Sequence, residues 1–97
     1  MSKHEASILI IDDDPDVLLA ARLFLRQHFS VVHTEKNPES IVMLMKRAIY
    51  DVILLDMNFS RDATSGKEGF FWLNKILEID PAAVVIFITG YGDVELA

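Results

Sequence analysis

The sequence contains no cysteine among its 97 residues, and it has only 4 glycines and 3 prolines. Without cysteine there is no disulfide framework and no thiolate metal site, which favours a reducing cytoplasmic compartment. Basic residues are also scarce, because 9 Lys and Arg stand against 15 Asp and Glu and the net charge is −6. That charge has the wrong sign for a surface that binds nucleic acid directly.

Long hydrophobic runs are absent as well. The longest apolar run, residues 82–88, is far too short to span a bilayer. The polar beginning of the chain does not have the shape of a signal peptide. We therefore expect a cytoplasmic protein without membrane contact. Core-forming residues are plentiful, since 52% of the chain is hydrophobic, and they predict one folded domain over residues 1–97.

Short apolar runs alternate with helical periodicity along the chain. Continuous apolar runs predict strands at residues 8–11, 52–55 and 84–88, and a further short strand fits residues 31–33. Helical spacing and cap-plus-proline signals predict helices at residues 15–28, 38–48 and 69–79, with a polar irregular segment at 57–68. This alternation predicts an α/β fold, a doubly wound parallel sheet with helices on both faces.

Two further expectations concern the first helix and the end of the chain. Val17, Leu18, Ala21, Phe24 and Leu25 recur at helical spacing and predict the buried face of the first helix. A fourth helix is expected to begin after Asp93, about one turn before the last residue. Doubly wound sheets do not usually end there, so we expect the chain to be a fragment of a longer protein.

Polar side chains stand where three predicted strands end. The first strand runs into Asp12, Asp13 and Asp14, the third into Asp56, and the fourth into Thr89. Because ligands bind outside the carboxyl ends of parallel strands, converging carboxylates here predict a hard divalent cation such as Mg²⁺. Their mutual repulsion is expected to raise at least one of their pKa values.

Each of these residues also has a plainer interpretation. Asp14 fits the N-cap of the first helix, whereas Asp12 and Asp13 fit solvated turn residues and Thr89 fits an ordinary strand end. The motifs at the ends of the first, third and fourth strands contain no His or Cys, which disfavours zinc. Calcium-loop, phosphate-loop and dinucleotide-binding patterns all lack required residues in this chain.

The three strand-end motifs together resemble those of a known family. Residues 8–15 read Ile-Leu-Ile-Ile-Asp-Asp-Asp-Pro, residues 52–58 Val-Ile-Leu-Leu-Asp-Met-Asn, and residues 85–90 Val-Ile-Phe-Ile-Thr-Gly. They resemble two-component response-regulator receiver domains, and Gly90-Tyr91-Gly92-Asp93 resembles the receivers of nitrogen-regulator-type (NtrC-like) transcriptional activators. The resemblance implies a flavodoxin-like sheet of order 2-1-3-4-5, here truncated before the fifth strand and helix.

The resemblance also implies roles for individual residues. Asp56 would accept a phosphoryl group from a histidine kinase or a phosphotransfer protein, and Thr89 would hydrogen-bond the new phosphoryl oxygens. Asp13 would bind Mg²⁺ (or Mn²⁺) directly together with Asp56, Asp12 would act through water, and Asn58 would offer its backbone carbonyl. The domain would be a phosphoacceptor rather than an enzyme, regulating an effector domain and through it transcription.

Two departures from the family pattern keep alternatives open. The family's Lys follows the fifth strand and its switch aromatic lies near the start of that strand, and the chain ends before both. This leaves an interaction-only pseudo-receiver as an alternative. The loop after Asp56 is long, and Lys67 in it is expected to be solvated. A phosphatase of the haloacid-dehalogenase type also places an Asp after a strand, but it needs a second Asp where Asn58 stands.

The predicted fourth strand has an unprotected edge. Residues 84–88 are apolar on both faces and contain no charge or proline that would discourage pairing with another chain. We therefore expect the strand to pair with a second copy, so that the isolated chain forms a homodimer or aggregates.

Overall fold

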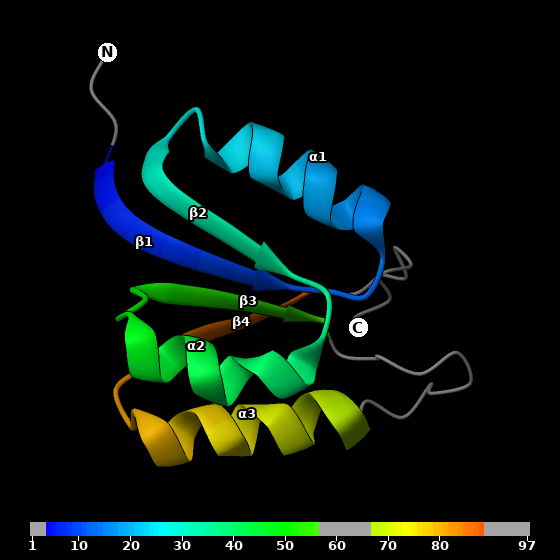
Figure 1. Cartoon of the computed structure of the whole chain (residues 1–97), viewed down its shortest axis with the longest axis vertical. Helices are drawn as coiled ribbons and strands as arrows, with labels where there is room; N and C mark the ends of the chain where they lie inside the picture. The colour runs from blue at the N-terminus through cyan, green and yellow to red at the C-terminus, as the bar shows by residue number, and fades with distance from the viewer. Residues whose placement is uncertain (1–3, 57–66, 89–97) are drawn as a thin grey trace, which may run out of the picture.

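The computed structural model describes residues 4–56 and 67–88. The first two elements are β1 (His4–Ile11) and α1 (Pro15–Leu25). The remaining elements are β2 (Phe29–Glu35), the 3₁₀ turn η1 (Pro38–Ser40), α2 (Ile41–Arg47), β3 (Val52–Asp56), α3 (Lys67–Ile79) and β4 (Val84–Ile88). Figure 1 shows the strands side by side with helices on either side of them.

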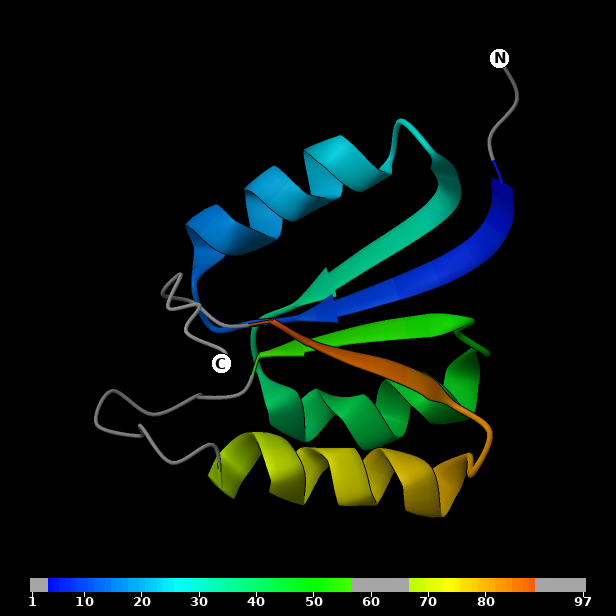
Figure 2. The same ribbon diagram turned by 180° about the vertical axis from the view of Figure 1, so that it is seen from behind.

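The four described strands form one parallel sheet in the order β2-β1-β3-β4. Ile8 of β1 is aligned with Val32 of β2 and with Val52 of β3, which in turn is aligned with Val84 of β4. Figure 2 shows the same sheet from behind, with β4, the last strand in this order, in front of β3. The predicted doubly wound parallel sheet is thus confirmed, and the observed order matches the first four strands of 2-1-3-4-5.

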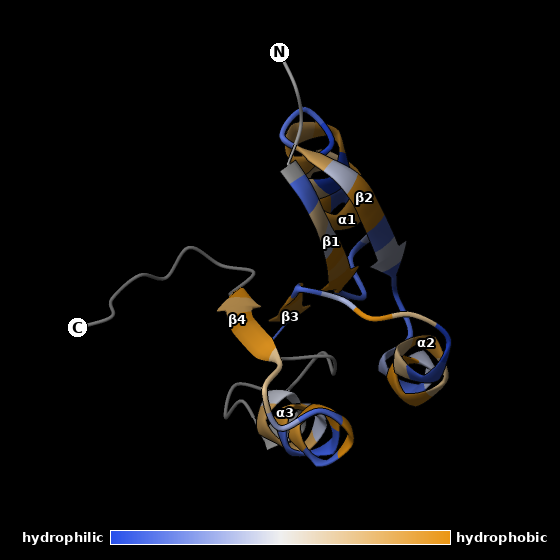
Figure 3. Ribbon diagram, turned by 90° about the vertical axis from the view of Figure 1, so that its left-hand side faces the viewer, coloured by the Kyte–Doolittle hydropathy of each residue, from blue (hydrophilic) through white to orange (hydrophobic). Residues whose placement is uncertain are grey.

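The helices cover the two faces of the sheet separately. Figures 1 and 3 place α1 on one side and α2 with α3 on the other. The core on the α1 side contains Ile8, Ile10, Leu18 and Val32. The core on the α2 and α3 side contains Leu9, Ile11, Ile41, Tyr50, Ile53, Leu55 and Ile76. Alternate residues of β1 therefore fill both cores, as expected of a strand covered on both faces.

The two cap-plus-proline signals have the predicted geometry. The Asp14 carboxylate accepts a hydrogen bond from the Asp16 backbone N–H at 2.9 Å, at the first turn of α1. The Asn37 side chain accepts one from the Glu39 backbone N–H at 2.9 Å, at η1. Each satisfies an N–H group that has no partner within its own helix, and the following proline has no N–H to satisfy.

Several expected boundaries, and one of the five positions expected on the buried face of the first helix, were wrong. α1 ends at Leu25 rather than at His28, and α3 begins at Lys67, inside the segment expected to be irregular. Phe24 is 60% exposed instead of buried. At about 100° per residue it lies roughly 120° around the helix from Leu18, at the margin of the apolar stripe. The centroid of its ring lies 5.2 Å from the centroid of the His28 ring.

The expected helix after Asp93 falls outside the described residues. Within the part of the chain that is described, no helix is long and apolar enough to cross a membrane.

Candidate functional site

The carboxyl ends of β1 and β3 bring two predicted aspartates together. Asp12 directly follows β1, and Asp56 is the last residue of β3. The register pairs Ile11 with Leu55, so the next residue along each strand is carried to the same point of the sheet edge. The ends of the β1 and β3 arrows lie side by side in Figures 1 and 2.

Asp13 joins these two residues in a cluster of three carboxylates. One carboxylate oxygen from each of Asp12, Asp13 and Asp56 lies within 4.8 Å of the other two. Asp12 is 3% exposed and Asp56 is 5% exposed, whereas Asp13 is exposed to solvent. Two buried acids beside a third, exposed one form a site that is closed on the protein side and open toward water.

Backbone hydrogen bonds hold Asp12 in place. Its carboxylate Oδ1 accepts from the Asp14 N–H at 2.9 Å, and its own N–H donates to the Glu35 carbonyl at 3.2 Å. The Asp14 side chain in turn caps the N-terminus of α1. The plain interpretation of Asp14 as an N-cap is therefore correct. Glu35 supports the site through its backbone carbonyl. This contact depends on the register of β2 and not on the side chain, so the sequence does not indicate it.

Burial raises the pKa of Asp12 above its usual value, and repulsion from Asp13 and Asp14 adds to the increase. The hydrogen bonds with the Asp14 backbone and the Asp56 side chain act in the opposite direction. The sequence predicts a raised pKa within the cluster, with mutual repulsion of the carboxylates as its cause. For Asp12, removal of the carboxylate from water raises the pKa more than this repulsion does.

The donor set fits a hard cation. All three side chains offer carboxylate oxygens, the ligands that Mg²⁺ and Mn²⁺ prefer, and a cation would offset the cost of burying two acids. The other two predicted site residues, Asn58 and Thr89, lie outside the described residues. Lys67 begins α3, and its side chain is likewise not described.

Two solved structures share the flavodoxin-like receiver fold of this chain. NtrX from Brucella abortus, solved in complex with ADP, superposes with a TM-score of 0.74 at 23% identity, over 96% of this chain and 20% of that one. TrrA from Thermotoga maritima, solved in complex with Mg²⁺-BeF, superposes with a TM-score of 0.69 at 24% identity, over 90% of this chain and 71% of that one. Both likenesses establish the fold.

Sequence comparison then gives the family. Residues 8–97 match the response regulator receiver domain, and the chain belongs to this family, whose members act in two-component systems. A curated relative, the hydrogenase transcriptional regulatory protein HoxA of Cupriavidus necator, is 30% identical over 95 residues. That alignment covers 98% of this chain and 18% of HoxA, so the chain spans about a fifth of its relative's length. The expected resemblance to NtrC-like transcriptional regulators is confirmed.

Proposed function

We propose that the chain is a phosphoacceptor switch in which Asp56 receives a phosphoryl group. The observation that carries this proposal is the carboxylate cluster at the ends of β1 and β3, with Asp56 buried beside Asp12 and Asp13. Asp56 ends a strand fixed between two others, so its carboxylate is held at a defined place at the rim of the sheet. Phosphoryl transfer depends mainly on such positioning and on charge neutralisation.

The transfer itself needs one nucleophile. An Asp56 carboxylate oxygen attacks the phosphorus atom and forms an acyl phosphate. The bond from phosphorus to the donor's histidine nitrogen breaks, and its electron pair stays on that nitrogen. Asp13 and Asp56 would hold Mg²⁺ directly, Asp12 through water, and Asn58 through its backbone carbonyl. A cation held there would neutralise charge on the phosphoryl oxygens, which the clustered carboxylates would otherwise repel.

The readout we propose runs through Thr89, two residues beyond Phe87 in the chain. Its hydroxyl would hydrogen-bond the new phosphoryl oxygens, and the added negative charge would draw its segment toward Asp56. The histidine donor would be a histidine kinase or a phosphotransfer protein. The output would be transcriptional, as the name of HoxA indicates for that relative. The Mg²⁺-BeF complex of TrrA supports a Mg²⁺-dependent site in this fold.

Labelling with a small phosphodonor tests the proposal. Incubation with acetyl phosphate and Mg²⁺ should add one phosphoryl group, detected by intact-protein mass spectrometry and placed on Asp56 by peptide mapping. The Asp56→Asn variant should remain unlabelled. Glu78→Gln, which removes one negative charge from the exposed side of α3, should be labelled like the wild type.

Two outcomes would favour the alternatives. A folded chain that binds Mg²⁺ but is never labelled would be an interaction-only pseudo-receiver. Multiple turnover of a generic phosphate ester would indicate a phosphatase of the haloacid-dehalogenase type, despite Asn58 in the position of its second Asp.

A further inference from the structure

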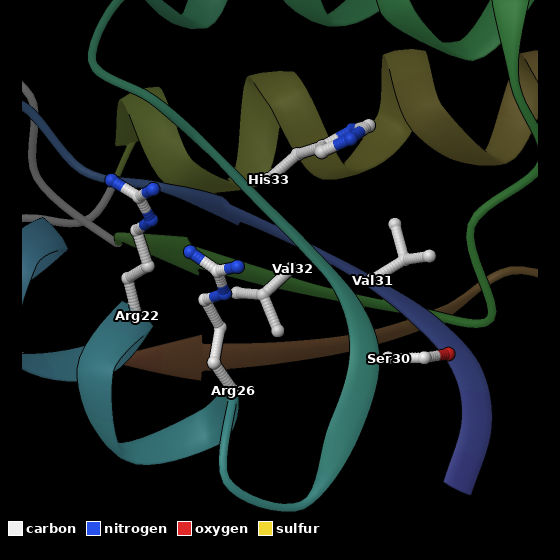
Figure 4. Close-up of a pocket in the computed structure, with 6 residues that line it drawn as sticks. All are labelled: Arg22, Arg26, Ser30, Val31, Val32 and His33. Atoms are coloured by element: carbon white, nitrogen blue, oxygen red, sulfur yellow. The ribbon is translucent and has the colours of Figure 1, made fainter. Parts of the chain in front are cut away.

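A shallow groove lies between α1 and β2, away from the carboxylate cluster. Its volume is about 300 Å³, at the lower end of the range for ligand sites. Its lining comes from one helix and one strand and consists of Arg22, Arg26, Ser30, Val31, Val32 and His33. Figure 4 shows the two arginine side chains rising from α1 in the same direction, with the β2 ribbon crossing beside them.

The groove is basic in an acidic protein. Arg22 and Arg26 stand one helical turn apart and both are exposed. Neither guanidinium forms an ion pair with any residue in the described ranges, and none of the six lining residues is acidic. Each guanidinium offers five N–H donors in a fork that matches a carboxylate. The groove therefore concentrates unpaired positive charge on a chain of net charge −6.

The strand beside the arginines has one unpaired edge. Within the described sheet, β2 is bonded only to β1. The Glu35 carbonyl accepts from Asp12, so Glu35 faces β1. Because backbone groups of successive residues point to opposite sides of a strand, those of Val32 and Thr34 face outward. These outward N–H and C=O groups can receive another extended chain.

We infer that this groove binds an extended, acidic segment of a partner protein, which adds to the sheet along β2. Side chains at alternate positions of an extended segment share one face and repeat about every 6.6–6.8 Å. Residues one helical turn apart have Cβ atoms about 5–6 Å apart. Two acidic side chains at alternate positions thus match Arg22 and Arg26, while the segment's backbone pairs with β2. This function lies outside phosphoryl transfer.

A labelled peptide with Glu at alternate positions and Thr between them is the probe. Fluorescence anisotropy measures its affinity for the wild-type chain. The double variant Arg22→Gln/Arg26→Gln should bind roughly fivefold more weakly or worse, as expected for two exposed charge pairs. The matched control Lys46→Gln/Arg47→Gln removes the same charge from the end of α2 and should bind like the wild type. In NMR, the Val32 and Thr34 amides should shift and gain protection from exchange when the peptide binds.

Several results would overturn the inference. One is absence of binding at millimolar peptide. Another is equal loss of affinity in the two double variants, which would indicate non-specific attraction. A peptide with Gln in place of Glu that binds equally well would remove the role of charge. The last is a pair of NMR results: inorganic phosphate shifts the Arg22 and Arg26 signals, and the peptide leaves the Val32 and Thr34 amides unchanged. Together they would mean that the groove binds only small anions.

Discussion

Strands β1, β3 and β4 each contain an apolar run, at residues 8–11, 52–55 and 84–88, yet water reaches these runs to very different extents. Ile10 of β1 and Leu55 of β3 are fully buried, whereas Val84 and Ile86 of β4 are 52% and 50% exposed. The hydropathy colouring in Figure 3 shows β4 as apolar along its whole length. An apolar run thus predicts a strand, but it does not predict how deeply that strand is buried.

Position in the sheet accounts for the difference. β1 and β3 have a hydrogen-bonded neighbour on each side, whereas β4 is bonded only to β3 among the described strands. On one face, α3 covers β4, and the ring centroids of Phe70 and Phe87 lie 5.3 Å apart. On the other face, α1 packs over β1 and β2 and does not extend to Val84 and Ile86. The following predictions test this contrast.

The largest effect is expected from removing the same side chain in a central and in an edge strand. Ile10→Ala should lower the free energy of unfolding by about 3–4 kcal/mol, because it leaves a cavity in a closed core. Ile86→Ala should lower it by about 1 kcal/mol or less, since half of that side chain is already in water. Urea unfolding of both variants measures the two values. Equal losses would mean that the outer face of β4 is covered in solution.

Self-association should also distinguish the edge strand β4 from the rest of the surface. If β4 pairs with a second copy, Ile86→Lys should weaken the association about tenfold, because a charged side chain on an edge strand opposes strand pairing. Leu23→Lys also replaces an exposed aliphatic side chain by lysine, but on α1, and should leave association unchanged. Sedimentation velocity over a range of concentrations gives both constants. A wild-type chain that stays monomeric at high concentration refutes the predicted homodimer.

The next effect concerns the polar end of a central strand. Asp12→Asn keeps an oxygen for the Asp14 N–H but removes a buried charge. Without divalent cations it should raise the free energy of unfolding at pH 7 by roughly 1 kcal/mol. With millimolar Mg²⁺ the order should reverse, because only the wild type gains the full stabilisation by the bound cation. Thermal melts with and without Mg²⁺ measure both arms, and Glu78→Gln serves as the charge-matched control.

The sign of the pH dependence follows from the raised pKa of Asp12. Between the unfolded value, near 3.8, and the higher folded value, the folded state binds more protons than the unfolded state. The Asp12 contribution therefore favours folding at low pH and is lost as the pH rises through this window. The Asn variant should lack this component. Identical pH profiles for the two proteins in the absence of cations would contradict the burial argument.

The elements and the site differ in how far sequence can predict them. The order of strands and helices follows from hydrophobic periodicity, and the caps at Asp14 and Asn37 follow from short-range chemistry. The meeting of Asp12 with Asp56 follows from a general property of parallel sheets. Features that depend on register could not be predicted. β2 extends over Phe29–Glu35 because pairing with β1 recruits polar residues that show no apolar pattern.

The smallest effect tests one of these register-dependent contacts. Tyr50, buried where the chain enters β3, has its hydroxyl 2.7 Å from Nδ1 of His33 on β2, and the two rings meet edge to face. Tyr50→Phe should cost about 0.5–1 kcal/mol at neutral pH, the low end for a hydrogen bond, because water can replace the hydroxyl at the exposed histidine.

Alkaline pH should narrow the stability difference between these two proteins. Burial raises the pKa of Tyr50 above its usual 10.0, so above pH 10 the unfolded chain loses this proton first. The folded state then holds more protons, and the stability of the wild type falls as the pH rises from 10 toward the folded pKa. The Phe variant has no such proton, so its deficit should shrink over this range of pH. Urea unfolding from pH 8 upward measures this, and a deficit that stays constant would show that Tyr50 ionises as freely in the folded chain as in the unfolded one.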